Sequence, residues 1–364
     1  MHIEIKKNDL LKKLELIARV ATKHPTLPIL QCVSITTVEN GALFSGTNLE
    51  IGITSLVSGV VSEEGTVAVP SSLLLQTISL MQDDVITLKT DGEVLVINSR
   101  GSQTTVNVFP SQEFPHIPEL QGKKERLDGA LFALGIKTVA FAASQSTIKP
   151  ELGSVYVAQK KERSLTFVAT DSFRLVEKTV SQSNITLENP LLIPQKNALE
   201  IARVLEVMGS DPDCVVGEGQ MAFYFKDGTY ITTRLTEGSF PDYVQIIPKE
   251  FVSHVTLLSA DLEHALKMTN LFANKFLQVK LTLNQNTLVV SSDGGESGKT
   301  EGRVPASLEG EELALSFNQK YLSDPLAHMP GESVVMHFAG VGRPMVMESV
   351  RENTIRYLVM PMNK

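Results

Sequence analysis

Hydrophobic residues recur along the chain at two spacings, one typical of amphipathic helices and the other of half-buried strands. Residues 10–21 carry apolar side chains three and four positions apart, which predicts a helix, and residues 262–269 repeat the pattern. Second helices are predicted near residues 74–81 and 199–205. Between the helices lie alternating, β-branched segments joined by hairpin signals at Asn40-Gly41, Asp91-Gly92 and Asp227-Gly228.

This order of elements occurs three times in the chain. Three strand-like segments end in a similar polar step at Thr47, Thr170 and Ser292, which are 123 and 122 residues apart. The dipeptide Phe-Pro also recurs, at Phe114 and Phe240. A period this long indicates whole domains rather than solenoid repeats. We therefore expect an α+β chain of three similar domains, each made of two βαβββ halves, over residues 1–122, 123–248 and 249–364.

Domains of this kind leave unpaired sheet edges at both ends of the chain, and exposed edges invite strand pairing. The candidate edge strands are residues 104–108 and the segment that follows Lys299. A head-to-tail contact between the first domain of one chain and the last domain of another can close into a ring. The alternative is a monomer whose edges are charged and shielded.

The composition, 42% hydrophobic and 20% charged residues, is ordinary for a globular protein. No apolar run approaches the roughly 18 residues that a membrane span needs, and the first residues do not match a signal peptide. We therefore expect a cytoplasmic protein in which Cys32 and Cys214 stay reduced. The formal net charge of −8 argues against a protein that holds nucleic acid by an excess of cations. It leaves open a protein that holds DNA by topology and needs only a locally basic lining.

Cations gather on one side of two predicted helices. Lys12, Arg19 and Lys23 share a stripe opposite the apolar residues of the first helix. Lys196 and Arg203 are seven positions apart on the second helix of the middle domain, and so share a face. On any single helix such side chains are usually no more than solvated. On helices of repeated domains they would together line a basic hole and contact phosphates without reading bases.

Four motifs, in register with the triplication, resemble the β subunit of bacterial DNA polymerase III. They are residues 24–30 (HPTLPIL), 169–175 (ATDSFRL), 238–243 (GSFPDY) and 357–362 (YLVMPM). The resemblance covers essentially the whole chain and implies the DNA clamp fold, with helices lining a central hole and sheets outside. It implies a homodimer, closed head to tail around double-stranded DNA. It also implies a non-catalytic processivity factor that uses no cofactor or metal and binds the polymerase α subunit, an ATP-driven clamp loader and other proteins with a clamp-binding motif.

The resemblance, taken with the helix cations, gives two sets of candidate site residues. The DNA-contacting set is Lys12, Arg19, Lys23, His24, Lys149, Lys196 and Arg203. The partner-peptide groove, which the family places between the second and third domains, would use Thr170, Ser172, Phe173, Arg174, Leu175, Pro241, Ile246, Leu358, Met360, Pro361 and Met362. An apolar groove with soft Met side chains can accept short peptides from many partners. Without the resemblance, these residues would be interpreted as core packing.

The sequence departs from the family pattern at four of the positions considered. His24 and Lys149 stand where Arg is usual, so the contact at His24 is expected to be weaker or pH-dependent. Phe173 replaces a His, which predicts a more apolar groove. Asn363 replaces a basic residue near the end of the chain.

Residues 293–300 (DGGESGKT) follow a predicted strand and resemble a phosphate-binding loop, which would favour a phosphotransferase. The loop pattern requires Gly where Asp293 stands, and Pro305 argues against a long helix after it. The seven histidines show no metal-ligand spacing. A further alternative is a monomeric, β-rich scaffold that binds partner peptides but no DNA.

Overall fold

The structure, a computed structural model, describes residues 1–181, 184–295 and 298–362. Asn363 therefore lies outside the described residues. The chain divides into two compact units: one holds Met1–Ala133, Asn184–Thr186 and Leu199–Leu235, and the other holds Leu134–Ser183, Leu187–Ala198 and Thr236–Lys364. Each unit contains a twelve-stranded sheet. Within the described residues, no helix combines the length and apolar character that crossing a bilayer requires.

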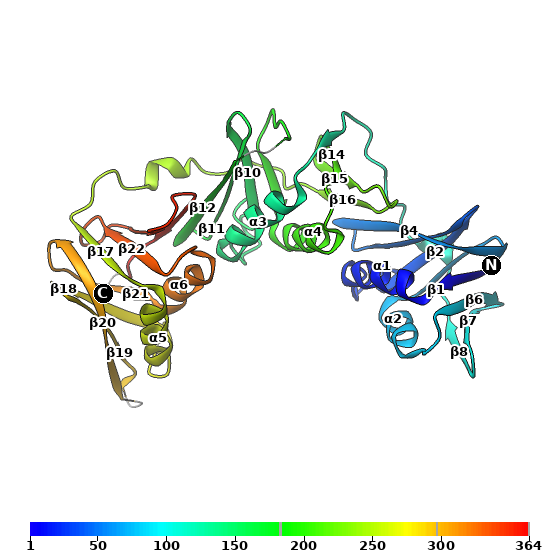
Figure 1. Ribbon diagram of the computed structural model, residues 1–364, viewed down its shortest axis with the longest axis horizontal. Helices are drawn as coiled ribbons and strands as arrows, with labels where there is room; N and C mark the ends of the chain where they lie inside the picture. Colours follow the sequence, from blue (N-terminus) through cyan, green and yellow to red (C-terminus); the bar gives the residue numbers. More distant parts are fainter. Residues whose placement is uncertain (182–183, 296–297, 363–364) are drawn as a thin grey trace. The chain divides into compact units, whose positions relative to one another are not determined.

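The described residues contain six consecutive runs of one element order, a strand, a helix and three further strands (Figure 1). The first two runs are β1 (His2–Lys6), α1 (Lys7–Val20), β2 (Cys32–Val38), β3 (Gly41–Thr47), β4 (Ile51–Glu63), then β5 (Thr66–Pro70), α2 (Ser71–Leu80), β6 (Val85–Asp91), β7 (Val94–Ser99), β8 (Ser102–Asn107). The next two are β9 (Glu125–Arg126), α3 (Gly129–Val139), β10 (Ser154–Lys161), β11 (Ser164–Thr170), β12 (Arg174–Ser181), then β13 (Leu191–Pro194), α4 (Gln195–Met208), β14 (Asp213–Gly217), β15 (Gln220–Tyr224), β16 (Tyr230–Arg234). The last two are β17 (Ser253–Leu258), α5 (Ser259–Asn270), β18 (Gln278–Asn284), β19 (Thr287–Asp293), β20 (Lys299–Gly310), then β21 (Ala314–Asn318), α6 (Gln319–Ser323), β22 (Ser333–Phe338), β23 (Met345–Ser349), β24 (Ile355–Val359).

The six βαβββ runs confirm the predicted α+β class, but one detail of the sequence alignment was wrong. The polar step that we placed at Ser292 belongs one residue later, at Asp293. The strand pairs next to the turn are Thr47 with Gly52, Thr170 with Leu175, and Asp293 with Lys299. Ser292 instead donates its hydroxyl to the carbonyl of Phe272, 3.0 Å away. At this position the spacing is therefore 123 residues at both intervals, because β3, β11 and β19 end at Thr47, Thr170 and Asp293.

In the first unit, α1 and α2 lie side by side against the sheet (Figure 1). Leu10, Leu14 and Ile17 of α1 are fully buried, as the helical spacing predicted. Gly46 of β3 allows the close approach, because a Cβ there would lie 2.6 Å from Cγ2 of Ile17. The opposite face of α1 is left free to carry charged residues.

In the second unit, the same kind of contact is made with the glycine on the helix instead of the strand. A Cβ on Gly135 of α3 would lie 2.4 Å from the ring of Phe167 on β11. Phe167 is fully buried, so the ring fills the space that the glycine leaves. In both repeats a glycine lets the helix pack closely against the strand, but the glycine lies on the strand in the first repeat and on the helix in the second.

The sheets continue from one repeat into the next by a regular rule. In the first unit β4 pairs with β16, with Gly52 opposite Thr232, and in the second unit β12 pairs with β24, with Leu175 opposite Leu358. In both cases the last strand of one repeat's first half pairs with the last strand of the next repeat's second half. By this rule β8, which pairs only with β7, lacks one neighbour among the described strands. The first part of β20 (residues 299–305), which pairs only with β19, also lacks one, whereas residues 306–310 pair with β17. The two strands are those that the sequence predicted as edges.

Candidate functional sites

The motif at residues 170–174 forms a tight turn between β11 and β12. The Thr170 hydroxyl donates to the carbonyl of Arg174 at 2.6 Å, and an oxygen of Asp171 accepts from the backbone N–H groups of Phe173 and Arg174, both at 3.0 Å. Ser172 has a positive φ of 78°. These bonds hold the turn in a conformation that leaves the Phe173 ring 60% exposed.

The first repeat contains the same turn, so its geometry belongs to the fold. Thr47 donates to the carbonyl of Ile51 at 3.0 Å, and Asn48 accepts from the N–H of Ile51 at 2.9 Å. Leu49 has a φ of 76°, where the second repeat has Ser172. What distinguishes the second repeat is therefore the choice of side chains on the turn, above all Phe173.

The side chain of Arg174, unlike that of Phe173, is buried, and its guanidinium group is hydrogen-bonded to three partners. Its guanidinium donates to Asp171 at 3.0 Å, to Asp324 at 2.6 Å and to the carbonyl of Phe141 at 2.9 Å. Its Cζ lies 4.5 Å from the ring centre of Tyr321, a cation–π distance. The structure therefore gives this residue a part in joining the second and third repeats.

Replacing Arg174 with Met should lower the free energy of unfolding by about 2–4 kcal/mol, because two partly buried carboxylates would lose their counter-ion. The midpoint of urea denaturation measures the loss. Arg174→Lys keeps the charge while losing the forked geometry, so it should lose less. An Arg174→Met protein as stable as the unchanged chain would contradict this account.

An apolar layer covers one face of the sheet where β12 meets β24. Leu175 and Leu358 are buried with Tyr243 of the 3-10 helix η4 (Tyr243–Ile246), and Phe240 and Ile247 pack against them. The segment that joins the second and third repeats thus lies against the same two strands that carry the 170–175 and 357–362 motifs.

The structure brings the predicted groove residues together in one unit, with different exposures. Four of these residues are buried: Thr170, Arg174, Leu175 and Leu358. The exposed ones are Ser172, Phe173, Pro241, Ile246 and Met360, while Pro361 and Met362 are half-buried. Two backbone hydrogen bonds hold the chain after β24 in place. The N–H of Met360 donates to the carbonyl of Phe173 at 2.8 Å, and the N–H of Met362 donates to the carbonyl of Ser316 at 2.7 Å. Exposed Met360 is therefore held beside exposed Phe173.

Two histidines that are 83 positions apart meet beneath the joining segment. The Nδ1 atoms of His254 on β17 and His337 on β22 lie 2.6 Å apart, and Glu348 lies 3.8 Å from Nε2 of His337. They line a pocket of about 390 Å³ together with Phe251. Burial lowers the pKa of His337, which favours the neutral form of that ring. No short sequence pattern reveals this pair, because the pairing of β17 with β22 brings the two histidines together.

The predicted DNA-contacting residues are exposed. Lys12 and Arg19 lie on the exposed face of α1, and Lys23 and His24 lie just beyond its last residue, Val20. Lys196 and Arg203 are exposed on α4, and Lys149 is exposed in the loop between α3 and β10. Arg19 is also held in a two-pronged ion pair with Glu200 of α4, at 2.9 and 3.0 Å. Glu200 was not among the predicted site residues, although it lies three positions before Arg203 on the same helix.

Three family models match successive parts of the chain. They describe the N-terminal domain of the DNA polymerase III beta subunit (residues 1–118), its central domain (126–242) and its C-terminal domain (244–363). The chain belongs to the DNA polymerase III beta subunit family. It is thus a sliding clamp of three clamp domains, a processivity factor and not an enzyme.

Similar proteins agree over their full lengths. The beta sliding clamp of Pseudomonas putida is 27% identical over 368 residues, covering 100% of both chains, and that of Bacillus subtilis is 27% identical over 99% of both. Among solved structures, the beta chain from Streptococcus pneumoniae superposes with a TM-score of 0.94 at 25% identity, covering 100% of both chains. The beta subunit from Pseudomonas aeruginosa gives a TM-score of 0.92 at 25% identity, with the same coverage.

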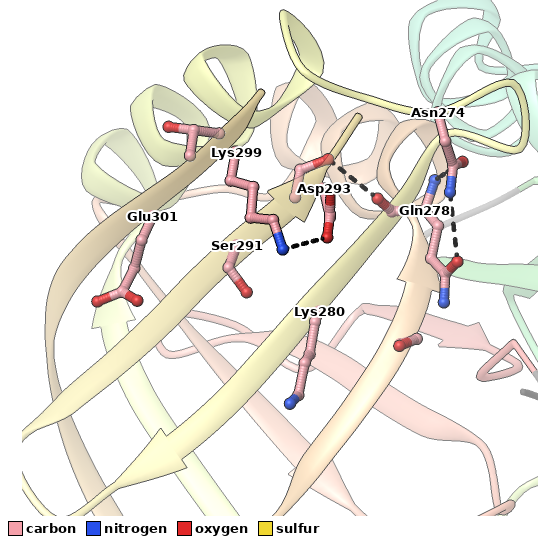
Figure 2. A pocket seen from close by; sticks show the side chains of 10 residues that line it. Asn274, Gln278, Lys280, Ser291, Asp293, Lys299 and Glu301 are labelled. Atoms are coloured by element: carbon pink, nitrogen blue, oxygen red, sulfur yellow. Dashed lines mark hydrogen bonds and ion pairs between the residues drawn. The ribbon is translucent and has the colours of Figure 1, made fainter. Parts of the chain in front are cut away.

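The loop that resembles a phosphate-binding motif is occupied by its own ion pair, and the enzyme alternative is wrong for this family. Figure 2 shows Lys299 turned toward Asp293, with Nζ 2.8 Å from Oδ2. The hydrogen bond from Lys299 lowers the pKa of Asp293, so the carboxylate stays charged where a phosphate would have to sit. The loop leads into β20 instead of a helix, and Pro305 lies within that strand. The polar pocket here, about 630 Å³, is lined by Asp293, Lys299 and Glu301 among others.

Proposed function

We propose that two copies of this chain close head to tail into a ring around duplex DNA, and that the groove at Phe173 and Met360 holds peptides from the replicative polymerase. The observation that carries the ring is the missing neighbour of β8 and of the first part of β20, residues 299–305. Each repeat's first half pairs with the second half of the next repeat, and the third repeat has no next one. The first repeat of a second copy supplies it, and twofold symmetry then fills both gaps.

The register of this contact follows from the pairs already present. Gly52 of β4 pairs with Thr232, and Leu175 of β12 pairs with Leu358. Lys299 occupies the same place in β20, next to the turn from the preceding strand. The same pairing with the partner's β8 sets Lys299 opposite Thr105. Strand β8 (SQTTVN) has no charged residue, so β20 with its Lys299, Glu301 and Arg303 meets no like charge there.

Exposed apolar side chains flank both free edges, which supports their burial in the ring. Beside β8, helix α2 exposes Leu73 and Leu80, the latter at 82%. Near the start of β20, Leu271 and Phe276 are 71% and 59% exposed, and the Phe272 ring lies 3.6 Å from where a Cβ of Gly298 would be. Clusters of this kind on a soluble chain mark contact surfaces.

The remaining assignments follow the resemblance. The exposed cations on α1, on α4 and in the Lys149 loop contact phosphates of any sequence. The exposed groove residues take short peptides of the polymerase α subunit, the clamp loader and other proteins with a clamp-binding motif. We place this activity in the cytoplasm; both cysteines are buried free thiols, as a reducing compartment allows.

Static light scattering tests the ring most simply. At micromolar concentration the mass should be twice the 39.8 kDa of one chain. A mass of one chain under these conditions would support the monomeric scaffold instead.

A further inference from the structure

Glu200 of α4 lies between two of the predicted DNA-contacting arginines. Its two oxygens accept from Nε and Nη2 of Arg19 at 2.9 and 3.0 Å, and one of them is 4.0 Å from Nε of Arg203. The side chain of Glu200 is 24% exposed, whereas those of Arg19 and Arg203 are 41% and 51% exposed. One carboxylate thus faces two guanidinium groups at a surface that water, and a ligand, can reach.

The geometry that Arg19 offers to Glu200 is the one that it would offer to a phosphate. A guanidinium binds a carboxylate or a phosphate through the same pair of parallel N–H donors. The hydrogen bond that Arg19 donates to Glu200 also raises the pKa of Arg19. A phosphate can therefore engage Arg19 fully only if Glu200 gives way.

A second cation of α1 is restrained in the same manner. Lys13 forms an ion pair with Asp227 and donates to the Thr229 hydroxyl at 2.8 Å. The exposed face of α1 also carries Glu15 between Lys12 and Arg19. The helix surface is therefore much less basic than its lysines and arginines alone would make it, in line with the net charge of −8.

We propose that Glu200 competes with DNA phosphates for Arg19 and Arg203 and so keeps the clamp's hold on duplex DNA weak. The proposal rests on the proposed function, in which these helices face DNA. A ring stays on DNA by topology and gains nothing from tight phosphate contacts, whereas each such contact must break when the ring moves. A carboxylate fixed beside the arginines supplies a substitute for each phosphate as it leaves.

Glu200→Gln tests this directly, because glutamine keeps the shape and removes the charge. Binding to a short linear duplex, measured by fluorescence anisotropy at about 100 mM NaCl, should tighten about threefold to tenfold. The slope of log affinity against log salt should steepen by about 1, since roughly one more phosphate is neutralised. Diffusion of the loaded ring along DNA should slow.

The matched control is Glu218→Gln, which changes the net charge equally on an exposed turn between β14 and β15. Equal affinities and salt slopes for Glu200→Gln and Glu218→Gln would overturn the proposal. Arg19→Ala and Arg203→Ala then show whether only the role of Glu200 has failed or the DNA-facing surface as well. If they weaken duplex binding, the DNA-facing surface stands and only the role of Glu200 fails; if they do not, the surface assignment fails as well. Glu200→Ala should tighten binding like Glu200→Gln, which guards against a folding defect in either variant.

Discussion

Replacing Thr105 with proline should convert the dimer into a monomer and abolish stable retention on circular DNA. The N–H of Val108 donates to Glu93 of the neighbouring chain segment, and that of Phe109 donates to the opposite side, to Ala68. Backbone groups alternate along a strand, so the N–H of Thr105, like that of Phe109, points away from β7. Proline removes this outward donor and leaves the β7–β8 ladder intact. We expect the dimer dissociation constant to rise at least about 100-fold, measured by analytical ultracentrifugation.

Thr105→Val is the matched control, because it keeps the N–H and favours strand geometry. It should dimerise like the unchanged chain. If Thr105→Pro remained dimeric with an unchanged dissociation constant, β8 would not be the closing strand.

Deleting residues 360–364 should abolish stimulation of the polymerase while leaving dimerisation intact. The deletion removes exposed Met360 and the backbone bond that holds it beside Phe173, yet β24 ends at Val359 and keeps its pairing with β12. Loss of a central apolar anchor typically costs 2 kcal/mol or more, so a labelled clamp-binding-motif peptide should bind about 30-fold more weakly or worse. Fluorescence polarisation measures the binding, and primer extension on a long template measures the stimulation.

Val341→Ser provides the control for the loss of a surface apolar side chain. Val341 is 77% exposed in the turn between β22 and β23, and its replacement should leave peptide binding unchanged. A truncated chain that no longer dimerises would show that the groove was wrongly assigned, and so would one that still binds the peptide fully.

The element order was predictable because it depends on local patterns. The apolar spacing of α1 and the hairpin dipeptides are visible within short windows of sequence. The repeat follows from comparing short similar segments along the whole chain, and the edge strands followed from the repeat. The short similar segments also carried the family resemblance. Strand pairing, which the sequence does not show, decides that Asp293 and not Ser292 is the residue next to the turn.

The interior of the sites was not predictable, because distant residues build it. Arg174 finds Asp324 150 positions away, and Arg19 finds Glu200 181 positions away. Asp171 lies three positions before Arg174, but nothing in the sequence near either arginine points to its distant partner. The resemblance named Phe173 and Arg174 together, whereas the turn leaves Phe173 exposed and Arg174, the first residue of β12, is buried.

Retention on circular and linear DNA tests the central claim most directly. The protein is loaded onto nicked circular duplex by a clamp loader with ATP, separated from free protein by gel filtration, and then the circle is cut once. A closed ring should stay with the intact circle and leave within minutes of linearisation, at a salt concentration that abolishes direct binding. Equal retention on both forms, or none on the circle, would contradict a ring that encloses DNA.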